Sequence, residues 1–115
     1  MSKIRTSWMN MFRSNEEELG PFEPSKVIRI RVQFSGTVQG VGFRYATYHL
    51  AERLGLLGWV KNLNNGDVLA EVQGEMDKVD YLVESMRTLN RAHVSHVTVE
   101  HVDLDPTCHE FKIEA

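Results

Sequence analysis

Hydrophobic and polar positions along the chain change period several times, and each period predicts an element of secondary structure. From Ile28 to Phe34 apolar and polar side chains alternate strictly, as they do in a strand with one face on a core. Residues 43–54 instead carry apolar side chains at steps of three and four, which predicts one face of a helix of about three turns. Gly55 is well placed to end that helix.

The rest of the chain alternates between strand and helix periods. The segment 64–67, Asn-Asn-Gly-Asp, has the residues that a tight hairpin turn favours. A break in alternation near His96 indicates a bulge in a later strand, and Pro106 ends that strand. The further elements predicted are strands at 59–63, 68–73, 94–104 and 111–113 and a helix at 76–90.

This order, β-α-β-β-α-β with a short terminal strand, predicts an α+β fold of the ferredoxin-like, split βαβ type. Two helices should pack on one face of an antiparallel or mixed sheet. The first and second strands then run parallel with the third between them, so their carboxyl ends lie at the same edge, roughly 10 Å apart. Many unrelated activities use this fold, so the fold assigns no function.

Length, charge and cysteine count exclude several classes of protein. A chain of 115 residues with 42% hydrophobic and 25% charged residues predicts one ordinary globular domain. A net charge of −3 argues against a general nucleic-acid binder, and no apolar stretch approaches the roughly 20 residues that a membrane helix needs. The first residues lack the apolar core of a secretory signal. Cys108 is the one cysteine, which excludes an internal disulfide, so we expect a reducing, cytoplasmic setting.

Residues 1–26 differ from the body at 27–115, and we interpret them as an N-terminal extension, flexible or loosely docked. Two prolines and an acidic run at 16–18 separate the extension from the body. The extension could be an amphipathic segment that docks on the body or on a partner, or a mobile tail, or the result of a start codon assigned too far upstream. Its apolar residues at helical spacing are Ile4, Trp8, Met11 and Phe12.

The stretch Gly36-Thr-Val-Gln-Gly-Val-Gly-Phe-Arg44 joins the first strand to the first helix. Its glycines allow backbone N–H groups to turn toward one point, and the first turn of the helix adds its unpaired N–H groups. Arg44 supplies a permanent charge and a fork of donors that fits two phosphate oxygens. We predict an anion cradle for a phosphoryl group. The alternative is a tight connection with a solvated arginine.

Asn62 stands where the second predicted strand ends, near the start of the hairpin. If the fold is as predicted, its carboxamide lies within reach of a ligand in the cradle and could align a water for attack on phosphorus. The alternative is a strand-end residue bonded to the backbone.

Two motifs in this body, Gly36–Arg44 and Gly58–Asn62, resemble those of the acylphosphatase family. They occur together, in order, at the spacing of the family and in the expected strand–loop–helix and strand–turn settings. The segments Val72-Gln73-Gly74 and Phe111-Lys112-Ile113 also fit, so the resemblance covers about residues 27–115. Two departures are the extension, which the usual compact enzyme lacks, and Asn90-Arg91, which stands where a Gly/Pro-type turn often closes the second helix.

The resemblance implies hydrolysis of the carboxyl–phosphate bond of acyl phosphates to a carboxylate and inorganic phosphate, with no cofactor, no metal ion and no covalent intermediate. By similarity, Arg44 grips the phosphate and Asn62 orients the attacking water. The loop would bind the phosphate together with Arg44, and its residues are Gln39, Gly40, Val41, Gly42 and Phe43.

Two other classes of protein are alternatives. The same fold and motif pair occur in domains of larger proteins that handle carbamoyl phosphate, so a non-catalytic acyl- or carbamoyl-phosphate-binding module is one. An RNA-binding ferredoxin-like domain is the other, but it would need exposed aromatic side chains on the central strands, and the polar side of 28–34 has none. We expect an acyl phosphate as the partner, no nucleic acid, no membrane and a monomer.

Several histidines and a tyrosine are candidates for metal binding or acid–base catalysis, but we expect them to have no role in a functional site. His93, His96 and His101 do not fall on one face of a regular strand, so we expect no metal site. His49, one helical turn beyond Arg44, and Tyr45 are expected at the helix surface or in packing.

Overall fold

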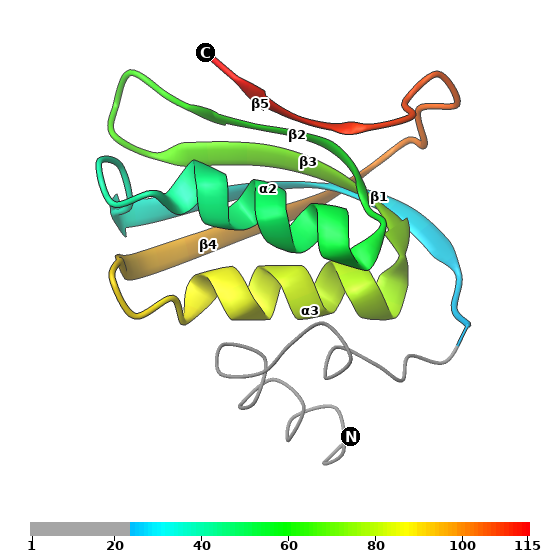
Figure 1. Ribbon diagram of the computed structural model, residues 1–115, viewed down its shortest axis with the longest axis horizontal. Helices are drawn as coiled ribbons and strands as arrows, with labels where there is room; N and C mark the ends of the chain where they lie inside the picture. Colours follow the sequence, from blue (N-terminus) through cyan, green and yellow to red (C-terminus); the bar gives the residue numbers. More distant parts are fainter. Residues whose placement is uncertain (1–23) are drawn as a thin grey trace.

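The computed structural model describes residues 24–115, which form two helices on one face of a five-stranded sheet (Figure 1). The strand order across the sheet is β4-β1-β3-β2-β5. The elements are β1 (Val27–Thr37), α2 (Phe43–Leu54), β2 (Leu57–Asn62), β3 (Val68–Glu75), α3 (Met76–Arg87), β4 (His93–Val102) and β5 (Phe111–Glu114).

The sheet is mixed and has the predicted topology. β3 lies between β1 and β2 and is antiparallel to both, so β1 and β2 run parallel and end at the same edge. β4 adds to β1 antiparallel, and β5 adds to β2 in parallel. The prediction of a ferredoxin-like α+β fold is confirmed.

Element boundaries follow the sequence pattern with shifts of one to three residues. β4 runs from His93 to Val102 and not from 94 to 104, so it ends four residues before Pro106. β2 begins two residues before the predicted strand, and β3 continues through Gly74 and Glu75. α3 ends at Arg87 and not at Asn90, since Thr88 leaves helical geometry at φ −110° and ψ 17°. Leu89 is nevertheless buried, which explains why the apolar stripe extended the predicted helix past its end. The bulge is confirmed, because the β1–β4 register shifts between Ser35 and Gly36, opposite residues 94–96.

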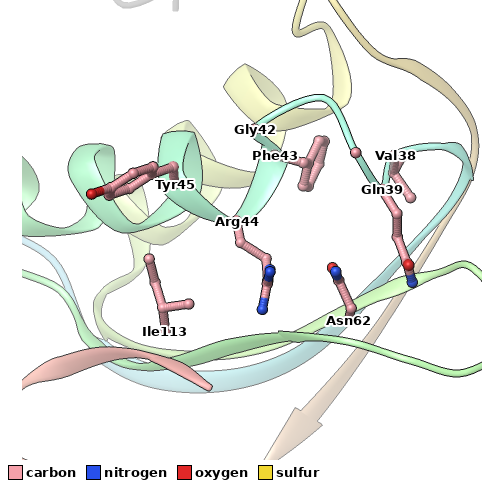
Figure 2. Close-up of a pocket in the computed structure, with 9 residues that line it drawn as sticks. Val38, Gln39, Gly42, Phe43, Arg44, Tyr45, Asn62 and Ile113 are labelled. Carbon is pink, nitrogen blue, oxygen red and sulfur yellow. The ribbon is translucent and has the colours of Figure 1, made fainter. Parts of the chain in front are cut away.

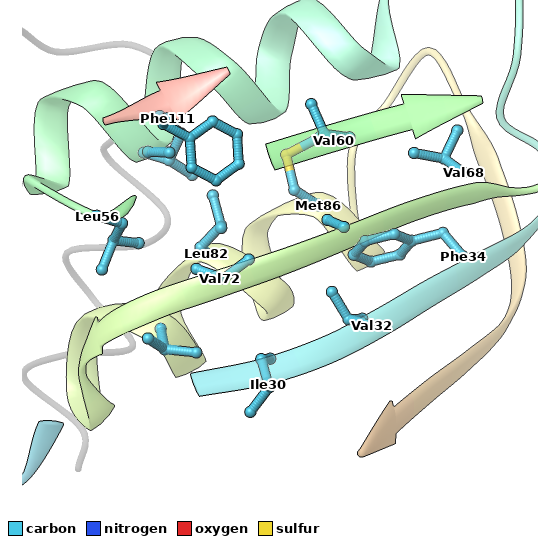
Figure 3. Close-up of a cluster of buried hydrophobic side chains, with 14 of the residues drawn as sticks. Ile30, Val32, Phe34, Leu56, Val60, Val68, Val72, Leu82, Met86 and Phe111 are labelled. Carbon is cyan, nitrogen blue, oxygen red and sulfur yellow. The ribbon is translucent and has the colours of Figure 1, made fainter. Parts of the chain in front are cut away.

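The core lies between the helices and the sheet, as the labelled side chains in Figure 3 show. From Ile28 to Phe34 the apolar residues of β1 point into this layer, and the polar ones lie on the other face. Phe34 on β1 and Phe43, the first residue of α2, meet edge to face with ring centroids 5.0 Å apart. Because an aromatic pair of this kind favours one geometry, it fixes the start of α2 over the carboxyl end of β1.

The face of the sheet without helices carries a buried ion pair. Arg29, only 5% exposed, donates from Nε to Glu71 at 2.9 Å, and Arg31 donates to the other carboxylate oxygen of Glu71. The segment between β4 and β5 covers this pair, since Gln73 exchanges hydrogen bonds with the backbone of Asp105 at 2.8 and 3.2 Å. Burial alone would raise the pKa of the Glu71 carboxyl, but the hydrogen bonds from the two arginines outweigh it and hold the pKa below its ordinary value.

We predict that Glu71→Gln lowers the free energy of unfolding by about 2 kcal/mol at pH 7, because the charged hydrogen bonds to a buried guanidinium are lost. A carboxyl whose pKa is depressed on folding stabilises the protein above its unfolded pKa, and this contribution is lost as the pH falls through the folded pKa. The difference between wild type and variant should therefore shrink between neutral and acidic pH. Urea unfolding at both pH values measures it, and a difference that is independent of pH would contradict this explanation.

Candidate active site

A pocket of about 310 Å³ opens where the carboxyl ends of β1 and β2 face the start of α2. Figure 2 shows Arg44 reaching into it from the helix and Asn62 pointing up from the strand below. The structure thus brings together two side chains that are 18 residues apart in sequence. The lining residues are Val38, Gln39, Gly40, Gly42, Phe43, Arg44, Tyr45, Asn62 and Ile113.

The loop before α2 leads into a helix start that has no side-chain cap. Gly40 and Gly42 have φ values of 77° and 78°, a region that side-chain-bearing residues avoid. Gly42 is the N-cap of α2 but provides no side-chain cap, and the first turn has no acidic residue. The first backbone N–H that bonds within α2 is that of Ala46, which donates to the oxygen of Gly42 at 3.0 Å, so the N–H groups of Phe43 and Arg44 have no partner within the helix. Such a helix start, with its positive dipole end open, suits an anion.

Arg44 is the second residue of α2 and the only cation that lines the pocket in the described part of the chain. Its Nη1 donates to the backbone oxygen of Glu114 at 3.1 Å, which ties the guanidinium to the end of β5. A guanidinium has five N–H donors, so this one hydrogen bond orients the group and leaves donors for a ligand in the pocket.

Asn62 owes its position to strand alternation. Val60, two residues earlier on β2, is fully buried beneath the helices, so Asn62 points to the same side, toward α2. Lys61 lies on the opposite face, with Nζ 5.3 Å from the centre of the Trp59 ring. Among residues 24–115 the Asn62 carboxamide has no hydrogen-bond partner, which leaves its donor and its acceptor available to a ligand in the pocket.

The side chain of Gln39 does not point its amide at the centre of the cradle. Its Nε2 donates to the backbone oxygens of Leu63 and Asp67 at 2.7 and 2.8 Å. These acceptors belong to the hairpin turn that follows Asn62, so Gln39 ties the cradle to the strand end that carries the asparagine. Its contribution to a bound anion would come from its backbone.

Val41 is the one predicted cradle residue that does not line the pocket. Its side chain packs against the core, and its carbonyl oxygen accepts a hydrogen bond of 2.8 Å from Nε of Arg91. The same guanidinium lies against Gly42, where a Cβ would meet Nε at 3.6 Å. Arg91, which follows α3, therefore braces the outer side of the loop. The only signal of this in the sequence was that Asn90-Arg91 replaced a Gly/Pro-type turn.

We predict that Arg91→Ala weakens the binding of inorganic phosphate about threefold to tenfold, the value of one exposed hydrogen bond that orders the loop. Turnover at saturating substrate should change less than KM, because Arg91 touches the loop and not the reacting atoms. Arg91→Lys should recover part of the loss, and Arg53→Ala, at the far end of α2, should have no effect. An unchanged phosphate inhibition constant in Arg91→Ala would contradict this role.

Two exposed side chains at the pocket mouth were not predicted as site residues. Ile113 on β5 is 40% exposed, and Tyr45 on α2 is 62% exposed and stacks on His49 with ring centroids 5.0 Å apart. His49 itself does not line the pocket. Ile113 reaches the mouth only because β5 pairs in parallel with β2, a contact that sequence periodicity does not reveal.

No group of three or more His, Cys, Asp or Glu side chains within residues 24–115 is arranged to hold a metal ion. His93, His96 and His101 are exposed along β4. In the same part of the chain, neither helix has the length and apolar character that crossing a membrane requires.

Comparison with known proteins identifies the family. The acylphosphatase family model matches residues 30–113. An acylphosphatase from Bifidobacterium longum is 41% identical over 93 residues, which cover 79% of this chain and 96% of the relative. One from Chlorobaculum tepidum is 38% identical over 74% of this chain and 94% of its own length.

A solved acylphosphatase structure from Coxiella burnetii superimposes with a TM-score of 0.72 at 38% identity. The superposition covers 76% of this chain and 93% of that structure. With the sequence matches spanning nearly the whole length of both relatives, the chain belongs to the acylphosphatase family.

Proposed function

We propose that Arg44, Asn62 and the loop from Gln39 to Phe43 form the catalytic site of an acylphosphatase. The activity is that of the family, hydrolysis of the carboxyl–phosphate bond of an acyl phosphate to a carboxylate and inorganic phosphate. The observation that carries the proposal is the convergence of the Arg44 guanidinium and the Asn62 carboxamide on one pocket at the start of α2.

The first step is binding of the phosphoryl group in the loop. The N–H groups of the loop and of the first turn of α2 would donate to its oxygens, together with the guanidinium of Arg44. Charge in the transition state is spread over the equatorial oxygens. Donors fixed in this position before the reaction stabilise that charge without reorganising, because the loop is held by Gln39 from one side and by Arg91 from the other.

The second step is attack by water. The Asn62 carboxamide oxygen would accept a hydrogen bond from the water and align it with phosphorus opposite the departing carboxylate. The new bond forms from the water oxygen to phosphorus as the bond from phosphorus to the carboxylate oxygen breaks. The proton of the water passes to a phosphate oxygen. A carboxylate is a good leaving group, so no general acid is required, and the proposal needs no metal ion and no covalent intermediate.

The assay is the hydrolysis of benzoyl phosphate, followed by the loss of ultraviolet absorbance, in the presence of a chelator. We expect turnover that is independent of added metal. The alternative function, a module that binds acyl or carbamoyl phosphate without turnover, would give measurable phosphate binding and no hydrolysis. The presence of both Arg44 and Asn62 in the pocket favours the enzyme.

The setting of the enzyme is also a proposal. We propose a cytoplasmic monomer that binds no nucleic acid. The single cysteine and the net charge of −3 support this. So does the pairing of Arg29 and Arg31 with Glu71, since it occupies the arginines of the open sheet face.

A further inference from the structure

A groove of about 440 Å³ runs between α3 and the edge strand β4, away from the active site. Val99 on β4 pairs with Val32 of β1 and so faces the same side of the sheet as the core. It is nevertheless 47% exposed, because α3 packs mainly over β1 and β3. Ile28, Ile30 and Val83 complete an apolar floor.

The rim of the groove is acidic. Asp80 and Glu84 line it from α3, and Asp77 lies one turn earlier on the same helix face. Burial and the nearby charge of Asp77 raise the pKa of the Asp80 carboxyl, against a lowering effect of His101. Glu84 also pairs with Arg87. A cationic segment lying in the groove would therefore stabilise the charged form of Asp80.

The described chain begins beside one end of this groove. Met76, which lines the groove, donates its backbone N–H to the oxygen of Lys26 at 2.8 Å. The N–H of Asp77 donates to Oγ of Ser25 at 3.2 Å. Residues 1–23 precede this point and lie outside the described residues, as does the amphipathic segment predicted from the sequence.

The sequence of residues 1–13 matches the groove in chemistry. Its apolar residues at helical spacing include Trp8 and Phe12, and its charged residues are all basic, namely Lys3, Arg5 and Arg13. Residues 14–23 make a tether of ten residues that spans up to roughly 33 Å when extended. The groove runs along a helix of 12 residues, about 18 Å long, so residues 1–13 can reach all of it.

We propose that residues 1–13 dock in the groove between α3 and β4. Their apolar side chains cover the exposed floor around Val99, and their basic side chains meet the acidic rim. A tethered segment acts at an effective concentration on the order of 1 mM, so this occupant has an advantage over a second copy of the chain at micromolar concentration.

Trp8 reports the docking in the chain of 115 residues once Trp59→Phe has removed the only other tryptophan of that sequence. Trp59 lies beside Arg29 on the sheet face without helices and is remote from the groove. We expect Trp8 in the folded chain to emit at shorter wavelength and to be quenched less by acrylamide than in the urea-unfolded chain. Val99→Asp should abolish both differences, and Asp80→Lys should reduce them. Leu104→Asp, at a residue that is 51% exposed outside the groove, should change neither.

Far-UV circular dichroism separates loss of docking from loss of folding in each variant. Solvated Trp8 in the folded chain would overturn the proposal, and so would a protected Trp8 that is indifferent to Val99→Asp. Protection that increases with protein concentration would also overturn it, since the groove would then hold a second copy.

Discussion

Replacement of Arg44 by alanine is expected to lower the turnover of benzoyl phosphate by roughly 10³–10⁵-fold, the range for an arginine that stabilises a transferring phosphoryl group. Arg44 is the only cation lining the pocket within residues 24–115. Its hydrogen bond to the backbone of Glu114 fixes the guanidinium before substrate arrives. Phosphate binding should be lost with turnover, because the same charge acts on the bound ground state and on the transition state.

The measurements for Arg44 are kcat, KM and the inhibition constant of inorganic phosphate. Arg44→Lys should recover only a small part of the loss, since an ammonium keeps the charge but not the planar fork of donors. Arg53→Ala, near the other end of the same helix, is the matched control and should behave as wild type. Tight phosphate binding in Arg44→Ala would contradict the assignment.

Asn62→Ala is expected to lower kcat by on the order of 10²–10³-fold, as the removal of one positioned polar group commonly does. In contrast to Arg44→Ala, the inhibition constant of phosphate should stay close to that of wild type. The reason is that the carboxamide enters the pocket from the strand, opposite the loop, where the water would sit.

Asn64→Ala is the matched control for Asn62, because it removes a carboxamide from an exposed position in the neighbouring turn. It should leave both constants unchanged. Full turnover in Asn62→Ala would show that another group aligns the water. A loss of phosphate binding as large as the loss of turnover would instead make Asn62 a binding residue.

The sequence predicted those features of the fold that rest on local pattern. Alternation from Ile28 to Phe34 marked β1 and its buried face, and the three- and four-residue steps after Phe43 marked α2. Both follow from the periods of strand and helix, which hold whatever the rest of the chain does. The break near His96 marked the bulge for the same reason. The prediction that Arg44 and Asn62 lie at one site depended on the predicted topology and on the family motifs together.

Features that depend on distant contacts were not predictable in this way. The bond from Arg91 to Val41 joins residues 50 apart, and no period in the sequence relates them. The hydrogen bonds of the Gln39 side chain to the hairpin turn are of the same kind. The end of α3 was predicted too late, because Leu89 is buried although it lies one residue past the helix C-cap at Thr88. Packing and long-range hydrogen bonds determine the contacts of Arg91 and Gln39 and the end of α3.

The most direct test of the site is a titration of ¹⁵N-labelled protein with inorganic phosphate, followed by amide chemical shifts. We predict that the largest shifts fall on the amides from Gly40 to Arg44, that they persist in Asn62→Ala, and that they vanish in Arg44→Ala. Shifts confined to another surface, or shifts in the loop that survive the loss of Arg44, would contradict it.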